Sequence, residues 1–351
     1  MTRRESGLNG RRKAPEETGG RREKKMDLMA ILTWAAMAVS FLLTLVIGRF
    51  VIVELRKLNA GQEIREDGPK WHAGKAGTPT MGGIMFILGA GVVVFLLGWG
   101  QMLRGEFAHL YVYLFALCFG LIGFVDDYRK VRQHQNEGLT AKQKFLLQLL
   151  AAVVFLCLMR YEGLLTNELY VPFFQVSFTV NWVLYLIFAA FVIVGAVNAV
   201  NLTDGIDGLA TSVTFVVMVF FTVTALLWHM STLALFPAAL AGGLAAFFVY
   251  NHHPAKVFMG DTGSLALGGF VVSTAYMLQI PLFIPIVAFI YFVEVLSVII
   301  QVTYYKRTKK RIFKMAPIHH HFELSGWPET KVVSIFSIVT AVLCLIGMLA
   351  Y

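Results

Sequence analysis

Charged side chains are scarce in this chain. Of its 351 residues, 15% are charged and 57% are hydrophobic, and the mean hydropathy is +0.68. Soluble domains carry about 25% charged residues, so this composition excludes a soluble enzyme or binding module. It is typical of an integral membrane protein, for which lipid is the solvent.

Cysteine is also rare, with only three residues in the whole chain. Cys118, Cys157 and Cys344 each lie in an apolar run without a second cysteine nearby. This spacing argues against a disulfide framework and against a zinc site. The net charge of +9 does not indicate a nucleic-acid partner, because a basic surplus in a membrane protein reflects its orientation and its contact with anionic lipid.

Long apolar stretches predict an all-α fold of about ten transmembrane helices, since about 17–25 residues cross the hydrocarbon core. The expected spans are 28–53, 80–100, 107–125, 143–160, 180–200, 209–228, 232–250, 263–280, 281–303 and 332–350. The loops after spans 1, 3, 7 and 9 carry eighteen lysines and arginines, whereas the alternate loops carry only Arg104 and Arg160. The positive-inside rule therefore places the basic loops in the cytoplasm and both termini outside.

The first 26 residues form a basic, polar segment that we expect to be a disordered tail, followed by a membrane domain over 27–351. Its positive charge conflicts with an external N-terminus. Met26 directly precedes the first span, so we hypothesise that translation starts there. A peptide from upstream of Met26 in purified protein would refute that hypothesis.

Five of the seven aspartates lie at the expected cytoplasmic ends of spans, where an unpaired carboxylate is costly. Asp126 and Asp127 close the third span in G-F-V-D-D-Y-R-K, with Lys130 three residues further on. Adjacent carboxylates in a basic setting suit a divalent cation and phosphate chemistry. The alternative is that this pair only ends a helix in the headgroup region.

A polar segment, N-A-V-N-L-T-D-G-I-D-G-L, separates the fifth and sixth spans. Asn198 and Asn201 share a helical face because they are three residues apart, and Asp204 and Asp207 repeat that spacing. Asp261 stands in G-D-T-G-S, just before the eighth span. The gathering of these carboxylates on one membrane face predicts one site around one cation.

The last basic loop contains A-P-I-H-H-H-F-E-L-S-G-W-P-E. Consecutive His319, His320 and His321 cannot all face one metal from a helix, because neighbours diverge by about 100 degrees. Imidazole suits phosphate binding near neutral pH, although a solvated loop is an alternative. Lys75, in K-A-G-T-P-T-M-G-G, is placed to contact an anionic substrate, and Glu294 in the ninth span is expected to pair inside the bundle.

In this order, these segments resemble the phospho-N-acetylmuramoyl-pentapeptide transferase family within the polyprenyl-phosphate N-acetylhexosamine-1-phosphate transferase superfamily. G-F-V-D-D-Y, N-x-x-N-L-T-D-G-x-D-G-L and F-M-G-D-x-G-S-L are similar to superfamily motifs. K-x-G-T-P-T-M-G-G and the histidine motif resemble the pentapeptide transferase branch. The resemblance runs from about Leu28 to the C-terminus.

The resemblance implies that UDP-N-acetylmuramoyl-pentapeptide and undecaprenyl phosphate give lipid I and UMP, with Mg²⁺ required, in peptidoglycan synthesis. It implies a homodimer of ten-helix subunits in the bacterial inner membrane, with a bent ninth helix and the active site facing the cytoplasm. Two routes are open: direct attack by the lipid phosphate, which we favour, with Asp126 assisting its deprotonation, or a covalent aspartyl phosphate.

The resemblance also implies roles for individual residues. Asn201 and Asp261 would hold the metal. Catalytic roles would fall to Asp126, Asp127, Asp204, His319 and His320. Substrate contacts would come from Lys75, Lys130, Asn198, Asp207, Asn251, Phe258, Gln301 and His321, with Phe258 stacking on the uracil.

Two other functions are compatible with parts of the sequence. A UDP-N-acetylglucosamine polyprenyl-phosphate transferase would share the superfamily motifs, and donor competition would separate the two activities. A secondary transporter also carries intramembrane carboxylates and glycine-broken helices, but it places them near the bilayer midplane and often has internal repeats. The expected position of the aspartates at span ends favours the transferase.

Overall fold

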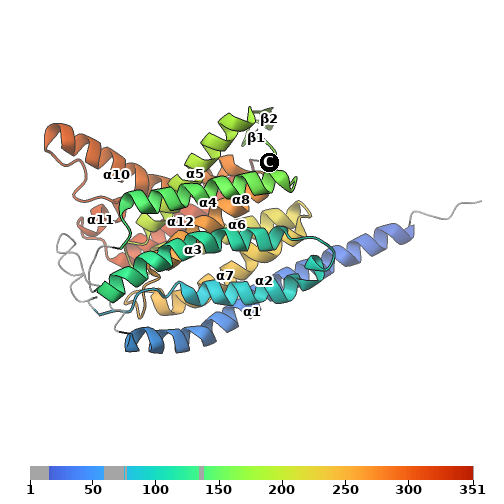
Figure 1. Cartoon of the computed structure of the whole chain (residues 1–351), viewed down its shortest axis with the longest axis horizontal. Coiled ribbons are helices and arrows are strands. Elements are labelled where there is room, and N and C mark those ends of the chain that lie inside the picture. The colour runs from blue at the N-terminus through green and yellow to red at the C-terminus, as the bar shows by residue number, and fades with distance from the viewer. Residues whose placement is uncertain (1–15, 59–74, 76, 134–137, 351) are drawn as a thin grey trace, which may run out of the picture.

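The computed structural model describes residues 16–58, 75, 77–133 and 138–350, with side chains from Leu28 onward. Within these residues, ten long helices form one bundle (Figure 1). The long helices are α1 (Glu16–Lys57), α2 (Ile84–Met102), α3 (Ala108–Gln133), α4 (Ala141–Tyr161), α5 (Trp182–Thr203), α6 (Leu209–Leu227), α7 (Ser231–Asn251), α8 (Gly260–Met277), α10 (Phe289–Thr308) and α12 (Glu329–Met348). The short elements are the strands β1 (Glu168–Val171) and β2 (Val176–Thr179), the 3₁₀ turn η2 (Pro281–Phe283), and the helices α9 (Ile284–Val287) and α11 (Ile318–Glu323).

Nine helices of the described residues are long and apolar enough to cross a membrane. The remaining long helix, α8, carries hydroxyl and glycine residues, and Thr262–Met277 are all buried in the bundle. Because protein rather than lipid surrounds α8, it tolerates these polar groups. The structure confirms an all-α membrane protein, and α8 occupies the place of the expected eighth span.

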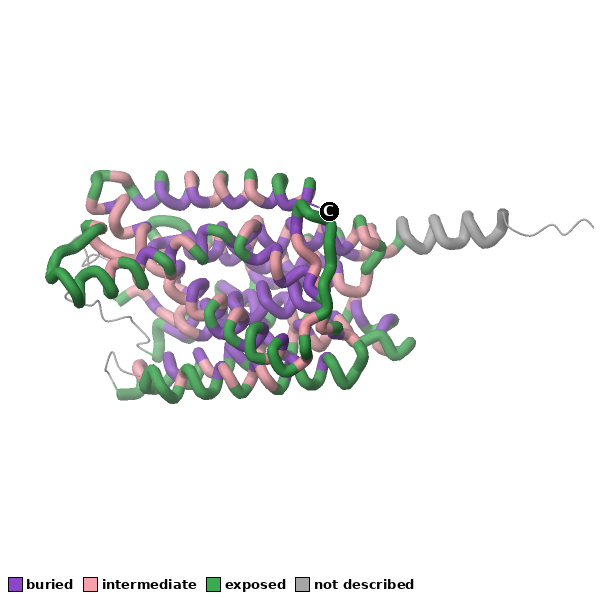
Figure 2. Tube along the Cα trace, turned by 90° about the horizontal axis from the view of Figure 1, so that it is seen from above, coloured by how far each residue is buried: buried purple, intermediate pink, exposed green. Residues whose placement is uncertain are grey.

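The centre of the bundle depends on small residues that let α8 approach its neighbours closely. A Cβ atom at Gly268 would lie 2.5 Å from the Cα of Val197 on α5. A Cβ atom at Gly269 would lie 2.9 Å from the Cα of Ala116 on α3. Close helix contact through small residues is typical of membrane bundles. Buried residues fill the middle of the molecule (Figure 2).

The two ends of the bundle carry different connections. Ala350, near the C-terminus, accepts hydrogen bonds from the backbone of Phe173 and the hydroxyl of Tyr170, in the β1–β2 hairpin. α1 begins at this same end (Figure 1). That arrangement agrees with an even number of crossings, while the side of the membrane on which each end lies stays a prediction.

Three details differ from the expected spans. α1 begins at Glu16, inside the segment assigned to a tail, because Glu, Arg and Lys are good helix formers that extend the apolar helix. Residues 1–15 lie outside the described residues, so their disorder and the start at Met26 stay predictions. The ninth span, for which the resemblance implies a bend, is interrupted at Ala288, between α9 and α10. The β1–β2 hairpin was not expected.

Candidate functional site

Three aspartates from two helices meet at the end of the bundle opposite the β1–β2 hairpin. Asp126 and Asp127 lie near the end of α3, and Asp261 lies in the first turn of α8. One oxygen from each carboxylate lies within 4.8 Å of the others. We call these three residues the carboxylate cluster. The close packing of α3 on α8 brings together residues that are far apart in the sequence.

Two lysines neutralise much of the negative charge in the carboxylate cluster. Lys130 Nζ lies 2.6 Å from Asp126 Oδ2 and 2.9 Å from Asp261 Oδ2. Lys144 Nζ, from the first turn of α4, lies 2.8 Å from Asp261 Oδ2 and 3.3 Å from Asp126 Oδ1. Three carboxylates and two ammonium groups therefore share one small region, with a formal charge of −1.

Asn201 and Ser264 hold the other side of Asp261. The Asn201 Nδ2 group donates to Asp261 Oδ1 at 2.8 Å and to Ser264 Oγ at 2.7 Å. Asn201 lies in the last turn of α5, so it fixes the position of α8 relative to α5. In this arrangement the amide nitrogen faces the carboxylate, and Asn201 orients Asp261.

Asp204 follows α5 directly, close to the carboxylate cluster. Burial of its carboxyl group raises its pKa well above the ordinary value, and the negative charges of Asp261, Asp127 and Asp207 raise it further. A carboxyl group in this position gains from a nearby cation. Asp204 therefore belongs to the electrostatic environment of the cluster.

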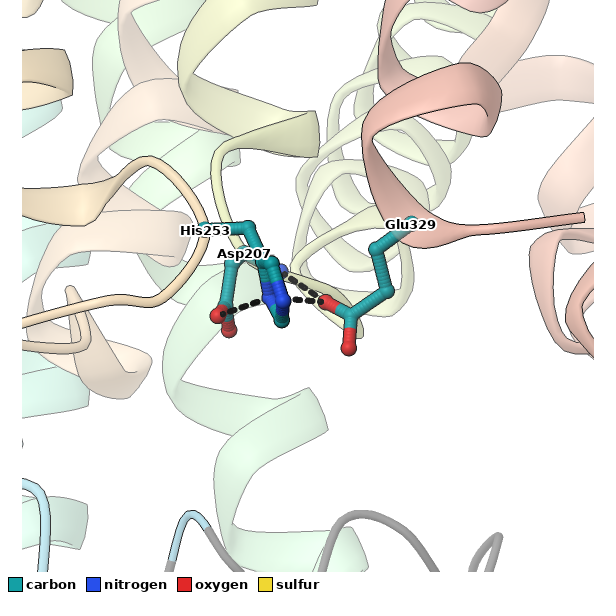
Figure 3. Close-up of side chains that lie close together, drawn as sticks. All are labelled: Asp207, His253 and Glu329. Atoms are coloured by element: carbon teal, nitrogen blue, oxygen red, sulfur yellow. Dashed lines mark hydrogen bonds and ion pairs between the residues drawn. The ribbon is translucent and has the colours of Figure 1, made fainter.

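A second group of charges surrounds Lys75, which precedes α2. Lys75 Nζ lies 2.8 Å from Asp207 Oδ1 and 2.7 Å from Glu329 Oε2. Figure 3 shows the Asp207 and Glu329 carboxylates on either side of the His253 ring, whose Nδ1 is 3.1 Å from Asp207 Oδ2. The Ala255 N–H donates to Asp207 at 3.0 Å. We call Lys75, Asp207, His253 and Glu329 the lysine cluster.

The five aspartates do not gather around one cation, and this corrects the sequence prediction. Asp126, Asp127 and Asp261 form the carboxylate cluster, whereas Asp207 pairs with Lys75 in the lysine cluster. The reason is that Asp207 lies beyond the end of α5 in the loop that faces α12, where Glu329 accepts its backbone N–H at 3.2 Å. The site consequently has two charged centres on the same end of the bundle.

Three further predicted substrate residues contact the protein itself. Asn198 donates to the side chain of Gln148 at 2.6 Å. Asn251 is buried, accepting from Thr211 at 2.7 Å and donating to the Val257 backbone at 3.0 Å. Phe258 is half-buried; its backbone N–H donates to the Pro79 carbonyl, and its own carbonyl accepts the Gly82 N–H. Asn251 and Phe258 therefore both help to shape the loop that leads into α8.

The histidines and Gln301 divide among different contacts. His319 is buried in α11, beside Glu294 of α10, as expected for an intramembrane glutamate that pairs within the bundle. His320 Nδ1 lies 2.6 Å from Glu323 Oε2, and His321 accepts the Lys314 N–H at 3.1 Å. Gln301 bonds to the backbone of Ile312 and Phe313, closing the loop after α10.

The donor set of the carboxylate cluster fits a hard divalent cation such as Mg²⁺, which binds carboxylate oxygens. Asp126, Asp127 and Asp261 each offer one such oxygen, and these three oxygens lie within 4.8 Å of one another. The ammonium groups of Lys130 and Lys144 lie against the same oxygens, so a cation there would share them with the lysines or move them.

Sequence reasoning missed several residues of the site. Beyond the count of basic loop residues, the sequence prediction gives no role to Lys144, Glu329 or His253, although each makes an ion pair with a predicted site residue. For Lys144 the available signal was its place in T-A-K-Q-K at the start of a span, on the same side of the membrane as the aspartates. For Glu329 it was a carboxylate at the start of the last span, the same signal that singled out Asp261.

Comparisons with known proteins give the same family. The family model described as Glycosyl transferase family 4 matches residues 109–279. The model described as phospho-N-acetylmuramoyl-pentapeptide-transferase signature 1 matches residues 75–87, which include Lys75. A phospho-N-acetylmuramoyl-pentapeptide-transferase of Clostridium acetobutylicum is 48% identical over 324 residues, covering 92% of this chain and 99% of the relative.

Two more relatives with the same printed name agree. The protein of Clostridium novyi is 46% identical, covering 92% of this chain and 97% of its own. That of Caldanaerobacter subterraneus subsp. tengcongensis is 47% identical, covering 88% of this chain and 95% of its own. Since the identity extends over nearly the whole length of this chain and of each relative, the chain belongs to the phospho-N-acetylmuramoyl-pentapeptide-transferase family.

Proposed function

We propose that this membrane protein transfers phospho-N-acetylmuramoyl-pentapeptide from its UDP derivative to undecaprenyl phosphate, giving lipid I and UMP in peptidoglycan synthesis. The observation that carries the proposal is the carboxylate cluster with Lys130 and Lys144, in a chain of this family. A site that joins two phosphate-bearing substrates has to hold like charges close together. Paired carboxylates, cations and a membrane position meet that requirement.

The chemical problem is mainly one of charge. The lipid phosphate and the donor pyrophosphate are both anions, and one phosphoanhydride is exchanged for another, so catalysis rests on positioning and neutralisation. Lys130 and Lys144 supply two ammonium groups at the cluster. We propose that Asp261, Asp126 and Asp127 hold Mg²⁺, with Asn201 orienting Asp261, and that Asp204 is the nearby carboxylate most sensitive to the cation. The bound metal would neutralise phosphate oxygens and stabilise the leaving UMP.

The contacts of Asp126 favour direct attack over a covalent intermediate. Asp126 is 1% exposed, its Oδ2 faces Lys130 at 2.6 Å, and its Oδ1 accepts the Leu139 N–H at 2.8 Å. Engaged oxygens of this kind are poor nucleophiles toward phosphorus. The lipid phosphate is already ionised near neutral pH, so it supplies the nucleophile itself.

We assign the lysine cluster to the nucleotide. Lys75 carries the positive charge, and Asp207 presents a carboxylate held by Ala255 and His253. Phe258 would stack on the uracil, and Asn251 would shape that pocket through Thr211 and Val257. Gln301, His320 and His321 would border the sugar phosphate from the loop after α10.

We further propose that the site faces the cytoplasm of a bacterial inner membrane, and that the protein works as a homodimer. The loops at the site's end carry most of the lysines and arginines outside the helices, which the positive-inside rule assigns to the cytoplasm. That side also holds the soluble nucleotide donor. Crosslinking in native membranes and cysteine labelling from each side would test these two statements.

The decisive experiment is an exchange assay on purified protein in detergent with undecaprenyl phosphate, following UMP release with each UDP-sugar. We expect release with UDP-N-acetylmuramoyl-pentapeptide and not with UDP-N-acetylglucosamine. Asp261→Asn should abolish release while the protein stays folded, and Glu54→Gln, which changes an exposed carboxylate, should have no effect.

Release with UDP-N-acetylglucosamine alone would replace the proposed donor. Wild-type turnover by Asp261→Asn at low Mg²⁺ would exclude our metal assignment.

A further inference from the structure

Glu294 and His319 form a buried pair that belongs to neither charged cluster. Each residue is 0% exposed, and Glu294 Oε2 lies 3.1 Å from His319 Nδ1. Glu294 lies within α10, and His319 lies in α11, so the pair joins the interrupted ninth span to the loop that follows it.

The pair is energetically costly, which argues that it is retained for a purpose. The two Glu294 oxygens and the two His319 ring nitrogens have no hydrogen-bond partner among the residues that the structure describes. Their ion-pair contact is close, but it lacks the alignment of a hydrogen bond. Burying polar atoms in this way is unfavourable, and a carboxylate in a membrane helix is a sign of function.

The opposite edge of the His319 ring faces Gly205. A Cβ atom at position 205 would lie 2.2 Å from His319 Nε2 and 2.6 Å from Cε1. The ring therefore occupies the space that any larger side chain would take. Gly205 follows Asp204 and lies in the same short loop as Asp207, so the ring packs directly on the backbone that carries both carboxylates.

This packing determines what His319 can do. The fully buried ring is not open to a direct substrate contact in this arrangement. The ring instead lies between Glu294 and the 204–208 loop, where a small shift would be passed to Asp204 and Asp207. Misplacement of reacting groups by about 1 Å can reduce a rate by about 100-fold.

We propose that Glu294 is a positioning residue that holds the His319 ring against Gly205 and thereby fixes the 204–208 loop for donor binding. The inference rests on the proposed function, since Asp207 is assigned to the nucleotide there. Glu294 itself touches neither substrate. Its effect passes through His319 and the loop backbone.

The test measures the KM of each substrate and kcat for three variants. Glu294→Ala should raise the KM of the UDP donor by roughly 10–100-fold, as the loss of a supporting partner does at other sites, and leave the KM of undecaprenyl phosphate unchanged. Glu294→Gln keeps an acceptor oxygen for the ring and should restore most of the donor affinity. Gly205→Ala pushes the ring from its other side and should reproduce the defect of Glu294→Ala.

The matched control is Ser297→Ala, which removes a buried hydroxyl that bonds to the Glu294 backbone on the same helix turn. It should leave the donor KM unchanged. If Glu294→Ala does not fold in detergent, the Gln and Gly205→Ala variants decide. Equal losses for both substrates, or a wild-type donor KM in Gly205→Ala, would overturn the inference.

Failure of the proposed function would show itself separately. If the wild-type protein uses another UDP-sugar, the same ratios are measured with that donor. If it transfers none, binding of UMP to the wild type and to each variant is measured by calorimetry. Unchanged UMP affinity in both Glu294→Ala and Gly205→Ala would then refute the positioning role.

Discussion

The Asp127 carboxylate on α3 binds the N-terminus of α8 through Thr262. Asp127 Oδ2 accepts the Thr262 N–H at 2.8 Å and the Thr262 hydroxyl at 2.7 Å, and Oδ1 accepts the Asp261 N–H at 3.1 Å. It thus acts as a capping residue supplied by a different helix, at the end where a helix dipole favours negative charge. Asp127 therefore fixes the helix turn that carries Asp261.

We predict that Asp127→Ala destabilises the protein by about 2 kcal/mol, because it removes a charged partner from buried donors. Asp261 should also shift, and transfer should be lost. Thermal unfolding in detergent and the exchange assay measure the two effects. Thr262→Val is the matched variant: it removes only the hydroxyl donor, so its cost should be about 1 kcal/mol. Equal stability of Asp127→Ala and wild type would contradict this account.

Gly123 permits the contact between α3 and α8 at the same place. A Cβ atom there would lie 2.0 Å from the carbonyl oxygen of Asp261 and 2.7 Å from the Thr262 nitrogen. Because both neighbours are backbone atoms, no side-chain rotation can relieve the clash. The spacing of the two helices, and with it the geometry of the carboxylate cluster, depends on the missing side chain.

Gly123→Ala should therefore separate α3 from α8, with an overpacking cost of about 1–3 kcal/mol and a large loss of transfer. Gly195→Ala on α5 is the control, since its added Cβ meets no described atom within 4 Å. Alanine favours helix over glycine by about 0.8–1 kcal/mol, so the control should be as stable as wild type or slightly more. The thermal midpoints of the two variants would be compared side by side. A neutral Gly123→Ala would show that the helices have room to move.

Much of the fold was predictable because the length of each apolar stretch, and the lysines and arginines between these stretches, can be read from the sequence without knowing which helices pack together. The polar segment around Asp204 was also visible, since it interrupts apolar residues. The ion-pair partners of the site residues were not predictable. Lys144 meets Asp261, and Glu329 meets Lys75, only because helices distant in the sequence pack together.

Residue type alone also could not show whether a polar side chain contacts the substrate or holds a loop of the protein in place. Gln301 was expected on the substrate side, yet its amide bonds to the backbone of the loop after α10. An amide, like a carboxylate, serves either purpose, and only its neighbours decide. The same holds for the single cation site expected from five aspartates. Three of them form the carboxylate cluster, Asp207 joins the lysine cluster, and Asp204 belongs to neither.

Asp204 should make stability depend on pH in a direction opposite to that of a salt-bridged aspartate. Its raised pKa means that folding favours the neutral carboxyl group. The contribution of neutral Asp204 to the free energy of unfolding is therefore fully present below the pKa of the unfolded state, about 3.9. It is lost as the pH rises through the higher pKa of the folded state. Above that range the ionisable carboxyl group makes the fold less stable than a neutral side chain of similar size would.

Asp204→Asn removes that charge and should raise the thermal midpoint above wild type at pH 8 but not at pH 4, while transfer falls sharply. The midpoints are measured in detergent at both pH values without Mg²⁺, with Glu54→Gln as the exposed control that changes neither. Adding Mg²⁺ should stabilise wild type more than the variant at pH 8, because a nearby cation favours the ionised form. A variant that is less stable than wild type at pH 8 would mean that the Asp204 carboxylate stabilises the fold, contrary to the charge arrangement around it.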